Sequence, residues 1–341
     1  MEQNLTLLCD NLNINDNKEK LQYVSDKVNT IIVITPSEGH NALAIANEAY
    51  DGLLRNTHIK IICIGNYTKK YYFSSEDHRK YELLLIPFPY APFDAFTYFD
   101  CQARLRDVIE PPNIKKSKVS FIYFGQRVER DIIFCELYKR DLLENVAYHS
   151  DKKENNRHEV VYNTSDNFIK NGYTDFATYE KIKYMLPKQL DNHFHFSGDF
   201  YSNTIKLASN SLFYIVSESN IAFNDNINVA TEKSAIPFLS KSIPIFITGN
   251  SIDALNWFED LGFDCFTDVI SRDVYELSLL DKINAVMDII DKTDISFFQN
   301  NVERFNKNYS LANYFVNLDN TLDKVIEDIV IEHNLQIIEK I

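Results

Sequence analysis

Short apolar runs that end at Gly or Pro set the strongest limit on how this chain can fold. The runs in the first part of the chain are residues 31–35, 59–64 and 82–86, and Pro36, Gly65 and Pro87 end them. Residues 40–54 carry apolar side chains at helical spacing between the first two runs. Continuous apolar strands that alternate with helices predict a parallel sheet buried on both faces. The fold class is therefore α/β.

The pattern stops at Glu110-Pro111-Pro112 and then starts again. A chain of 341 residues favours two domains. We expect an N-terminal α/β domain over 1–112 and a second α/β domain over 113–310. A helix over 311–341 would then pack back toward the first domain. In the second domain, strands are predicted over 119–124, 212–216 and 243–248, and helices over 129–143, 231–240 and 251–261, with Gly262 as the C-terminal cap of the last.

Composition excludes several classes of protein. Hydrophobic residues make up 45% of the chain, which disfavours disorder. The net charge of −14 disfavours broad coating of a nucleic-acid backbone. The densest basic stretch, 113–118, is predicted to be a solvated linker. Five dispersed cysteines without a CxxC pair disfavour a disulfide framework and favour a reducing compartment.

No signal peptide is expected, because the N-terminus has no basic region followed by a long apolar run. No membrane span is expected, because no apolar stretch approaches 18 residues. We therefore expect a cytoplasmic protein. The richness in Asn, Ile and Lys is typical of AT-rich genomes, such as those of many phages and giant viruses, and for a viral protein the compartment would be the host cytoplasm.

One block of the second domain carries the chemistry. A strand ends near Glu218, a helix opens at Thr231-Glu232-Lys233, and a further strand runs from Pro244 to Gly249. Open α/β sheets bind ligands at the carboxyl ends of their strands. Free N–H groups of a helix capped by Thr231 favour a diphosphate, Lys233 adds a positive charge, and Glu232 can accept hydrogen bonds from ribose hydroxyls. On its own, Thr231-Glu232-Lys233 would be interpreted as the start of a surface helix. The interpretation as a binding site depends on the strands that flank it in the sequence.

The setting resembles the α-1,3-fucosyltransferase family and its viral and bacterial relatives, over roughly 119–268. The shared residues are Glu218, Thr231, Glu232, Lys233, Pro244, Gly249, Leu255, Leu261, Gly262, Phe263 and Phe266. The chain departs from the family at Ser219-Asn220, where Asn-Ser is preferred, and at Val229, where Tyr is usual. The resemblance implies two Rossmann-like domains facing a cleft, the GT-B arrangement, with a helical C-terminal segment and a glycosyltransferase activity.

The resemblance also implies the roles of individual residues. An Arg at the start of the helix after residues 121–124 pairs with the donor diphosphate in the family, and Arg130 is the candidate, with Arg127 as alternate. No metal and no cofactor are implied beyond a nucleotide-sugar co-substrate of GDP or UDP type, because Lys and Arg offset the leaving charge. His193 and His195 lack a third ligand nearby, which favours a structural role over a metal site.

An inverting enzyme needs a general base for the acceptor hydroxyl, and the N-terminal domain should supply it. Glu38 and His40, in the loop after the first strand, are the first and second candidates, and Asp94 is the third. For each one, simple solvation in a loop is the competing interpretation. The acceptor is expected to be the hydroxyl of a glycan or of another molecule.

Three alternatives stay open. Transfer of sugar to modified bases of phage DNA fits the composition, but the charge opposes it unless the fold contains a basic groove. A Rossmann oxidoreductase should carry GxGxxG after its first strand, and the chain has no such motif. A non-catalytic nucleotide-sugar-binding protein would keep the fold without turnover.

Overall fold

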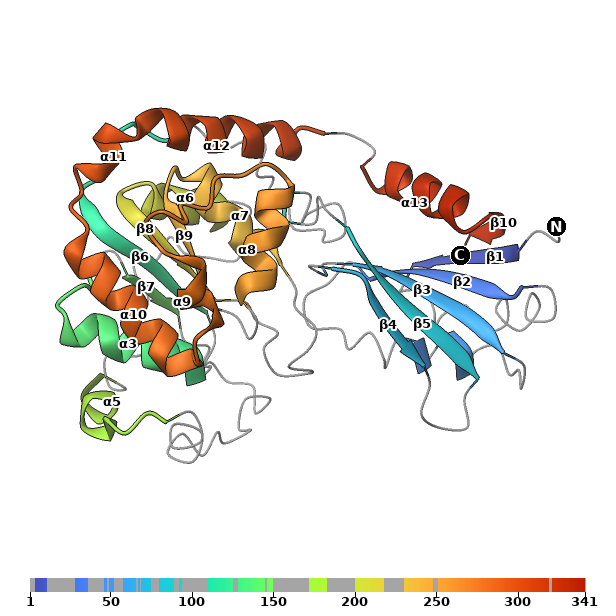
Figure 1. Ribbon diagram of the computed structural model, residues 1–341, viewed down its shortest axis with the longest axis horizontal. Coiled ribbons are helices and arrows are strands. Elements are labelled where there is room, and N and C mark those ends of the chain that lie inside the picture. The colour runs from blue at the N-terminus through green and yellow to red at the C-terminus, as the bar shows by residue number, and fades with distance from the viewer. Residues whose placement is uncertain are drawn as a thin grey trace. The chain divides into compact units, whose positions relative to one another are not determined.

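The computed structural model describes residues 4–10, 28–35, 46, 47, 49–51, 58–65, 67, 69–74, 80–88, 92, 93, 110–124, 128–144, 146–149, 172–182, 200–217, 230–247, 251–318 and 321–340. The chain divides into two compact units. Unit 1 comprises Met1–Tyr98, Ser219–Thr231 and Leu318–Ile341, and unit 2 comprises Phe99–Glu218 and Glu232–Asn317. Each unit contains one largely parallel sheet, so the expected α/β class is confirmed (Figure 1).

The sheet of unit 1 has six strands in the order β10-β1-β2-β3-β5-β4. All neighbours are parallel except the pair of β4 with β5. The strands are β1 (Asn4–Asp10), β2 (Thr30–Thr35), β3 (Ile59–Gly65), β4 (Tyr71–Ser74), β5 (Tyr81–Pro87) and β10 (Leu335–Lys340). Residues 46, 47 and 49–51 are helical, within the helix expected over 40–54.

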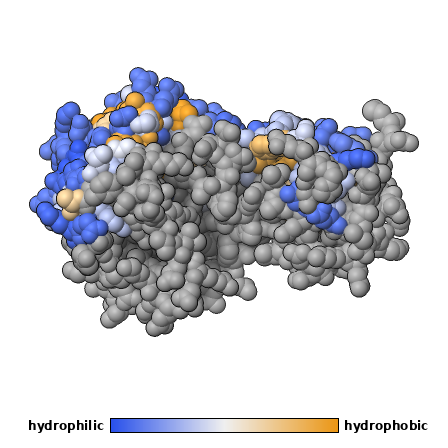
Figure 2. Space-filling view, turned by 90° about the horizontal axis from the view of Figure 1, so that it is seen from below, coloured by the Kyte–Doolittle hydropathy of each residue, from blue (hydrophilic) through white to orange (hydrophobic). Residues whose placement is uncertain are grey.

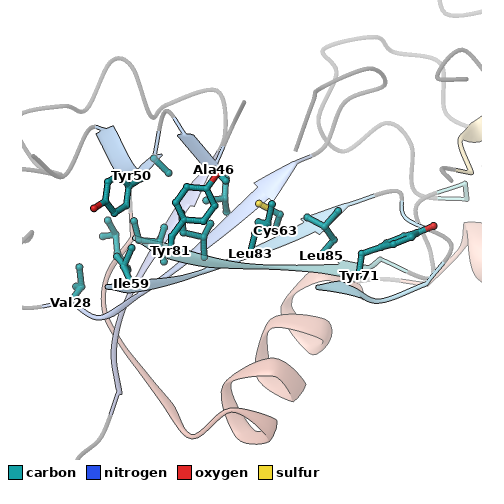
Figure 3. Close-up of a cluster of buried hydrophobic side chains, with 14 of the residues drawn as sticks. Val28, Ala46, Tyr50, Ile59, Cys63, Tyr71, Tyr81, Leu83 and Leu85 are labelled. Carbon is teal, nitrogen blue, oxygen red and sulfur yellow. The ribbon is translucent and has the colours of Figure 1, made fainter. Parts of the chain in front are cut away.

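Alternate side chains of each strand enter two separate cores, because successive residues of a strand point to opposite faces. Ile31, Ile61 and Leu83 pack with Ala46 and Tyr50 on one face. Figure 3 shows this cluster on one side of the sheet and a helix on the other side. That helix is α13 (Thr321–Glu332), whose Ile326 and Ile329 pack against alternate residues of the same strands: Leu8, Ile32, Ile62, Ile64, Leu84 and Ile86.

The C-terminal segment is not the single helix that was expected over 311–341. The helix α12 (Val302–Val316) ends at Asn317, α13 follows, and β10 forms a parallel edge strand beside β1. The apolar spacing of 335–340 resembles a continuing helix, but Asn334 breaks it with a φ of 50°. A left-handed residue at this place ends α13.

The sheet of unit 2 has four parallel strands in the order β7-β6-β8-β9. They are β6 (Ser117–Phe124), β7 (Val146–His149), β8 (Ser211–Val216) and β9 (Ile243–Phe246). The helices of this unit are α3 (Val128–Lys139), α5 (Phe176–Ile182), α6 (Phe200–Ala208), α7 (Glu232–Leu239), α8 (Ser251–Asp260), α9 (Arg272–Glu276), α10 (Leu279–Lys292), α11 (Phe297–Asn300) and α12.

Two groups of helices cover this sheet. The helices α6 and α7 contact β8, with α12 packed on α7, whereas α3 and α10 pack together and α10 contacts β6 (Figure 1). The crossovers from β6 to β7 and from β8 to β9 run in opposite directions along the sheet. Right-handed crossovers of opposite direction place their helices on opposite faces.

Gly262 ends α8 as predicted. Its φ is 93°, the Phe263 N–H donates to the Phe258 carbonyl, and the Gly262 N–H donates to the Glu259 carbonyl. These two bonds form a Schellman motif. The rings of Phe258 and Phe263 meet edge to face at 5.7 Å, the apolar contact that usually accompanies the motif.

The basic stretch 113–118 is not the solvated linker that was expected. Lys115 is buried, and its ammonium donates to the carbonyls of Ser209 and Ser240 at the carboxyl ends of α6 and α7. It also donates to Ser242 Oγ. The negative ends of two helices explain why a lysine is buried here.

The described surface is mainly hydrophilic on the face shown in Figure 2, where apolar colours are confined to small areas. Within the described ranges, no helix is long and apolar enough to cross a membrane.

Candidate functional site

The order of the strands in unit 2 identifies where a ligand can bind. From β6 the chain moves to β7 on one side and then crosses to β8 on the other side. A reversal of this kind leaves a crevice outside the carboxyl ends of the two central strands, here β6 and β8. The helices α3 and α7 also begin at this edge, because each follows the carboxyl end of a strand and leads to a parallel strand.

Arg130 lies at this edge of the sheet, in the first turn of α3. Its Nη2 donates to the Ser217 carbonyl at 2.9 Å, and its Nε donates to Ser217 Oγ at 3.2 Å. The guanidinium therefore ties the start of α3 to the residue that follows β8. Arg130 is only 3% exposed, and buried Glu129 and Asp131 flank it in the same turn. These two acidic residues complement the positive end of the helix.

The helix α7 presents the second part of the site. It begins at Glu232, directly after buried Thr231, and Lys233 is half-buried in its first turn. Pro237 lies inside this helix and has no N–H to donate to the Lys233 carbonyl four residues earlier. The first turn of α7 thus provides N–H groups and one ammonium at the carboxyl edge, which is a suitable environment for phosphate oxygens.

Among the predicted site residues, Arg130 and Lys233 lie in unit 2, in the first turns of α3 and α7 that begin at this edge, whereas Thr231, which directly precedes α7, belongs to unit 1. Glu232 is the first residue of α7. The remaining candidates lie outside the described residues, and these are Glu38, His40, Asp94, Arg127 and Glu218.

The downstream residues of the family-like motif have structural roles. Leu255, Phe263 and Phe266 are buried. The Arg304 guanidinium lies 4.5 Å from the centre of the Phe266 ring and forms ion pairs with Asp264 and Asp268. The Pro244 carbonyl accepts a hydrogen bond from the Tyr275 hydroxyl. These residues hold α8, α9 and α12 to the sheet.

Sequence reasoning missed one polar pair. Lys282, on α10, is 2% exposed, and its Nζ lies 2.9 Å from Oγ of Ser251, the first residue of α8. Burial lowers the pKa of Lys282 to about 8. A signal was present, because Lys282 shares the apolar face of α10 with Val286 and Ile290 at intervals of four residues.

Comparison with known proteins returns no relative. The chain matches no protein-family model, and no curated protein and no solved structure is similar to it.

Proposed function

We propose that this protein is a glycosyltransferase that binds a nucleoside-diphosphate sugar at the carboxyl edge of the four-stranded sheet. One observation carries the proposal. The strand order makes the carboxyl ends of β6 and β8 the point where the crossovers diverge, and the first turns of α3 and α7, which contain Arg130 and Lys233, begin at that edge. The resemblance of this block to fucosyltransferases supports the same reaction class.

In the proposal, Lys233 and the N–H groups of the first turn of α7 bind the diphosphate. Their positive charge stabilises the diphosphate as it departs, when its negative charge increases. Arg130 acts mainly by position, because two of its nitrogens already hold Ser217, the residue before Glu218. Glu232 would accept hydrogen bonds from the ribose.

The rest of the proposal rests on the family resemblance. The enzyme would invert the sugar without a metal ion, and unit 1 would supply the acceptor site across a GT-B cleft. The acceptor hydroxyl needs a base, for which Glu38, His40 and Asp94 are the candidates. The donor sugar, of GDP or UDP type, stays open in the proposal.

A thermal-shift experiment tests the donor site. The purified protein would be heated with UDP, GDP, CDP, dTDP and CMP, each with and without Mg²⁺. A nucleotide that binds the native state raises the melting temperature by mass action. We expect a shift with one nucleoside diphosphate that does not require Mg²⁺.

A pair of variants makes this test specific. Lys233→Ala should abolish the shift or lower turnover by about 10²–10³-fold, the scale for the loss of one preformed electrostatic group. Lys206→Ala removes the same charge from the last turn of α6, which ends at the opposite edge of the sheet, and should bind nucleotide normally. Wild-type binding and turnover in Lys233→Ala would refute the site.

A further inference from the structure

The junction between α13 and β10 contains a histidine that contacts the start of β3. His333 directly follows Glu332, the last residue of α13, and its side chain is half-buried. Lys60 is the second residue of β3, in the alternate row that continues with Ile62 and Ile64. Its side chain therefore lies on the face of the sheet that α13 covers. The junction thus places an imidazole beside a lysine, and both belong to unit 1.

This contact determines where the imidazole carries its proton. The Nζ atom of Lys60 lies 3.3 Å from Nδ1 of His333. An ammonium can only donate, so Nδ1 accepts the hydrogen bond and carries no proton. The proton of the neutral ring is then on Nε2, which is buried and has no acceptor among the residues that the structure describes. A second proton would turn Nδ1 from an acceptor into a donor that faces the ammonium.

Three charged groups within the described ranges act on the ring: Lys60 on β3, Lys70 just before β4, and Glu332 on α13. The two ammoniums oppose a positive ring, whereas the carboxylate favours it. Lys70 already donates to both oxygens of that carboxylate, at 2.9 and 3.1 Å. Burial, and then the charge of Lys60, hold the pKa of His333 below its ordinary value of 6.5, despite the carboxylate.

We propose that His333 is a pH switch for the α13–β10 segment: its neutral ring holds the segment on the six-stranded sheet, and its protonation favours release. Release would uncover the apolar face to which Ile32, Ile62 and Leu84 belong. Histidine suits this role because its ordinary titration lies between pH 5 and 8, so mild acid is enough. The inference does not rest on the proposed function, since it concerns unit 1 alone.

The direction of the switch follows from proton linkage. In the released segment, His333 is in water and takes up a proton near pH 6.5, whereas on the sheet its pKa is lower. The released state therefore binds more protons between the two pKa values, and a fall in pH shifts the equilibrium toward release. Each unit of difference between the two pKa values multiplies the equilibrium constant for release by about ten.

Hydrogen exchange on the full-length chain tests the switch. Mass spectrometry would measure the protection of residues 321–340 between pH 7 and pH 5, with each rate divided by the intrinsic rate at that pH. Nuclear magnetic resonance would measure the pKa of His333 in the folded protein. His333→Gln keeps an acceptor for Lys60 but cannot take up a proton. His58→Gln is the matched control, because His58 lies in the same unit with a side chain that is 61% exposed.

In the wild type and in His58→Gln, we expect the protection of 321–340 to fall as pH falls below 6.5. The fold-change should equal the one that the measured pKa of His333 dictates. Protection should stay constant in His333→Gln. It should fall less in Lys60→Met, which removes one opposing charge and provides the comparison if His333→Gln does not fold. Peptides of α10, in unit 2, should keep their protection, which separates release from general acid unfolding.

Several results would overturn the inference. They are constant protection of 321–340 in the wild type, an equal loss of protection in His333→Gln, and an unchanged acid response in Lys60→Met. A parallel loss of protection in α10 would also overturn it, because acid would then unfold the chain as a whole.

Discussion

Replacement of Lys115 by Met should destabilise unit 2 substantially. The substitution keeps the length of the side chain but removes the donor that bonds the Ser209 and Ser240 carbonyls and Ser242 Oγ. Each buried carbonyl that loses its partner costs about 1–3 kcal/mol, so two cost about 2–6 kcal/mol. Removal of the buried ammonium also removes the cost of its desolvation, which offsets part of the loss. We therefore expect the free energy of unfolding to fall by about 2–4 kcal/mol.

The single tryptophan gives a direct measurement. Trp257 lies on α8 and is 7% exposed, so its fluorescence reports the unfolding of unit 2 in urea. Lys115→Met should lower the urea midpoint, whereas Lys116→Met, at an exposed neighbouring position, should leave it nearly unchanged. An unchanged or raised midpoint in Lys115→Met would show that the lysine is tolerated at the two helix ends without stabilising them.

The same variant gives a test by pH. Burial, and then the charge of Lys241, hold the pKa of Lys115 well below its ordinary value of 10.5. The unfolded state therefore binds more protons than the folded state between the lowered pKa and 10.5, and stability rises with pH over that window. Lys115→Met should lose this rise, and a pH profile identical to that of the wild type would contradict the argument.

Three further predictions follow from the structure. Gly262→Ala should lower the free energy of unfolding by about 1–2 kcal/mol, measured in urea by Trp257 fluorescence, because an alanine is strained at a φ of 93°. The added Cβ would meet Leu311 Cδ2 at an ordinary 3.6 Å, so no clash contributes. A neutral result would mean that the backbone relaxes. Truncation after Asn317 removes α13 and β10 and exposes one apolar face of the six-stranded sheet, which loses about 1.5–3 kcal/mol of stabilisation for each side chain that is no longer buried. Limited proteolysis should therefore digest 1–98 rapidly, and persistent protection of that segment would contradict the packing. Hydrogen bonds from Arg304 lower the pKa of Asp268, so Asp268→Asn should lower the free energy of unfolding by at most about 1 kcal/mol at pH 7. The difference in stability between variant and wild type should vanish as pH falls through that lowered pKa. A difference that persists in acid would mean that the substitution disturbs packing.

The sequence alone determined the α/β class and most of the strands of both sheets. It did so because a strand buried on both faces needs a continuous apolar run, and such runs are visible at 31–35, 59–64, 82–86 and 212–216. The end of α8 was predictable for a similarly local reason, since Gly262 adopts a φ that other residues avoid. The strands β1, β4 and β7 were missed, because edge and near-edge strands mix polar and apolar residues.

The roles of the buried lysines and the topology of the C-terminus depend on contacts between segments far apart in the chain. Lys115 looks like a surface lysine in sequence, and its burial depends on helix ends brought to it from distant parts of the chain. Leu335–Lys340 forms a strand because β1, more than 300 residues earlier, offers an unpaired edge. Local periodicity cannot reveal such a partner, since strand pairing is decided by hydrogen bonds between segments far apart in the chain.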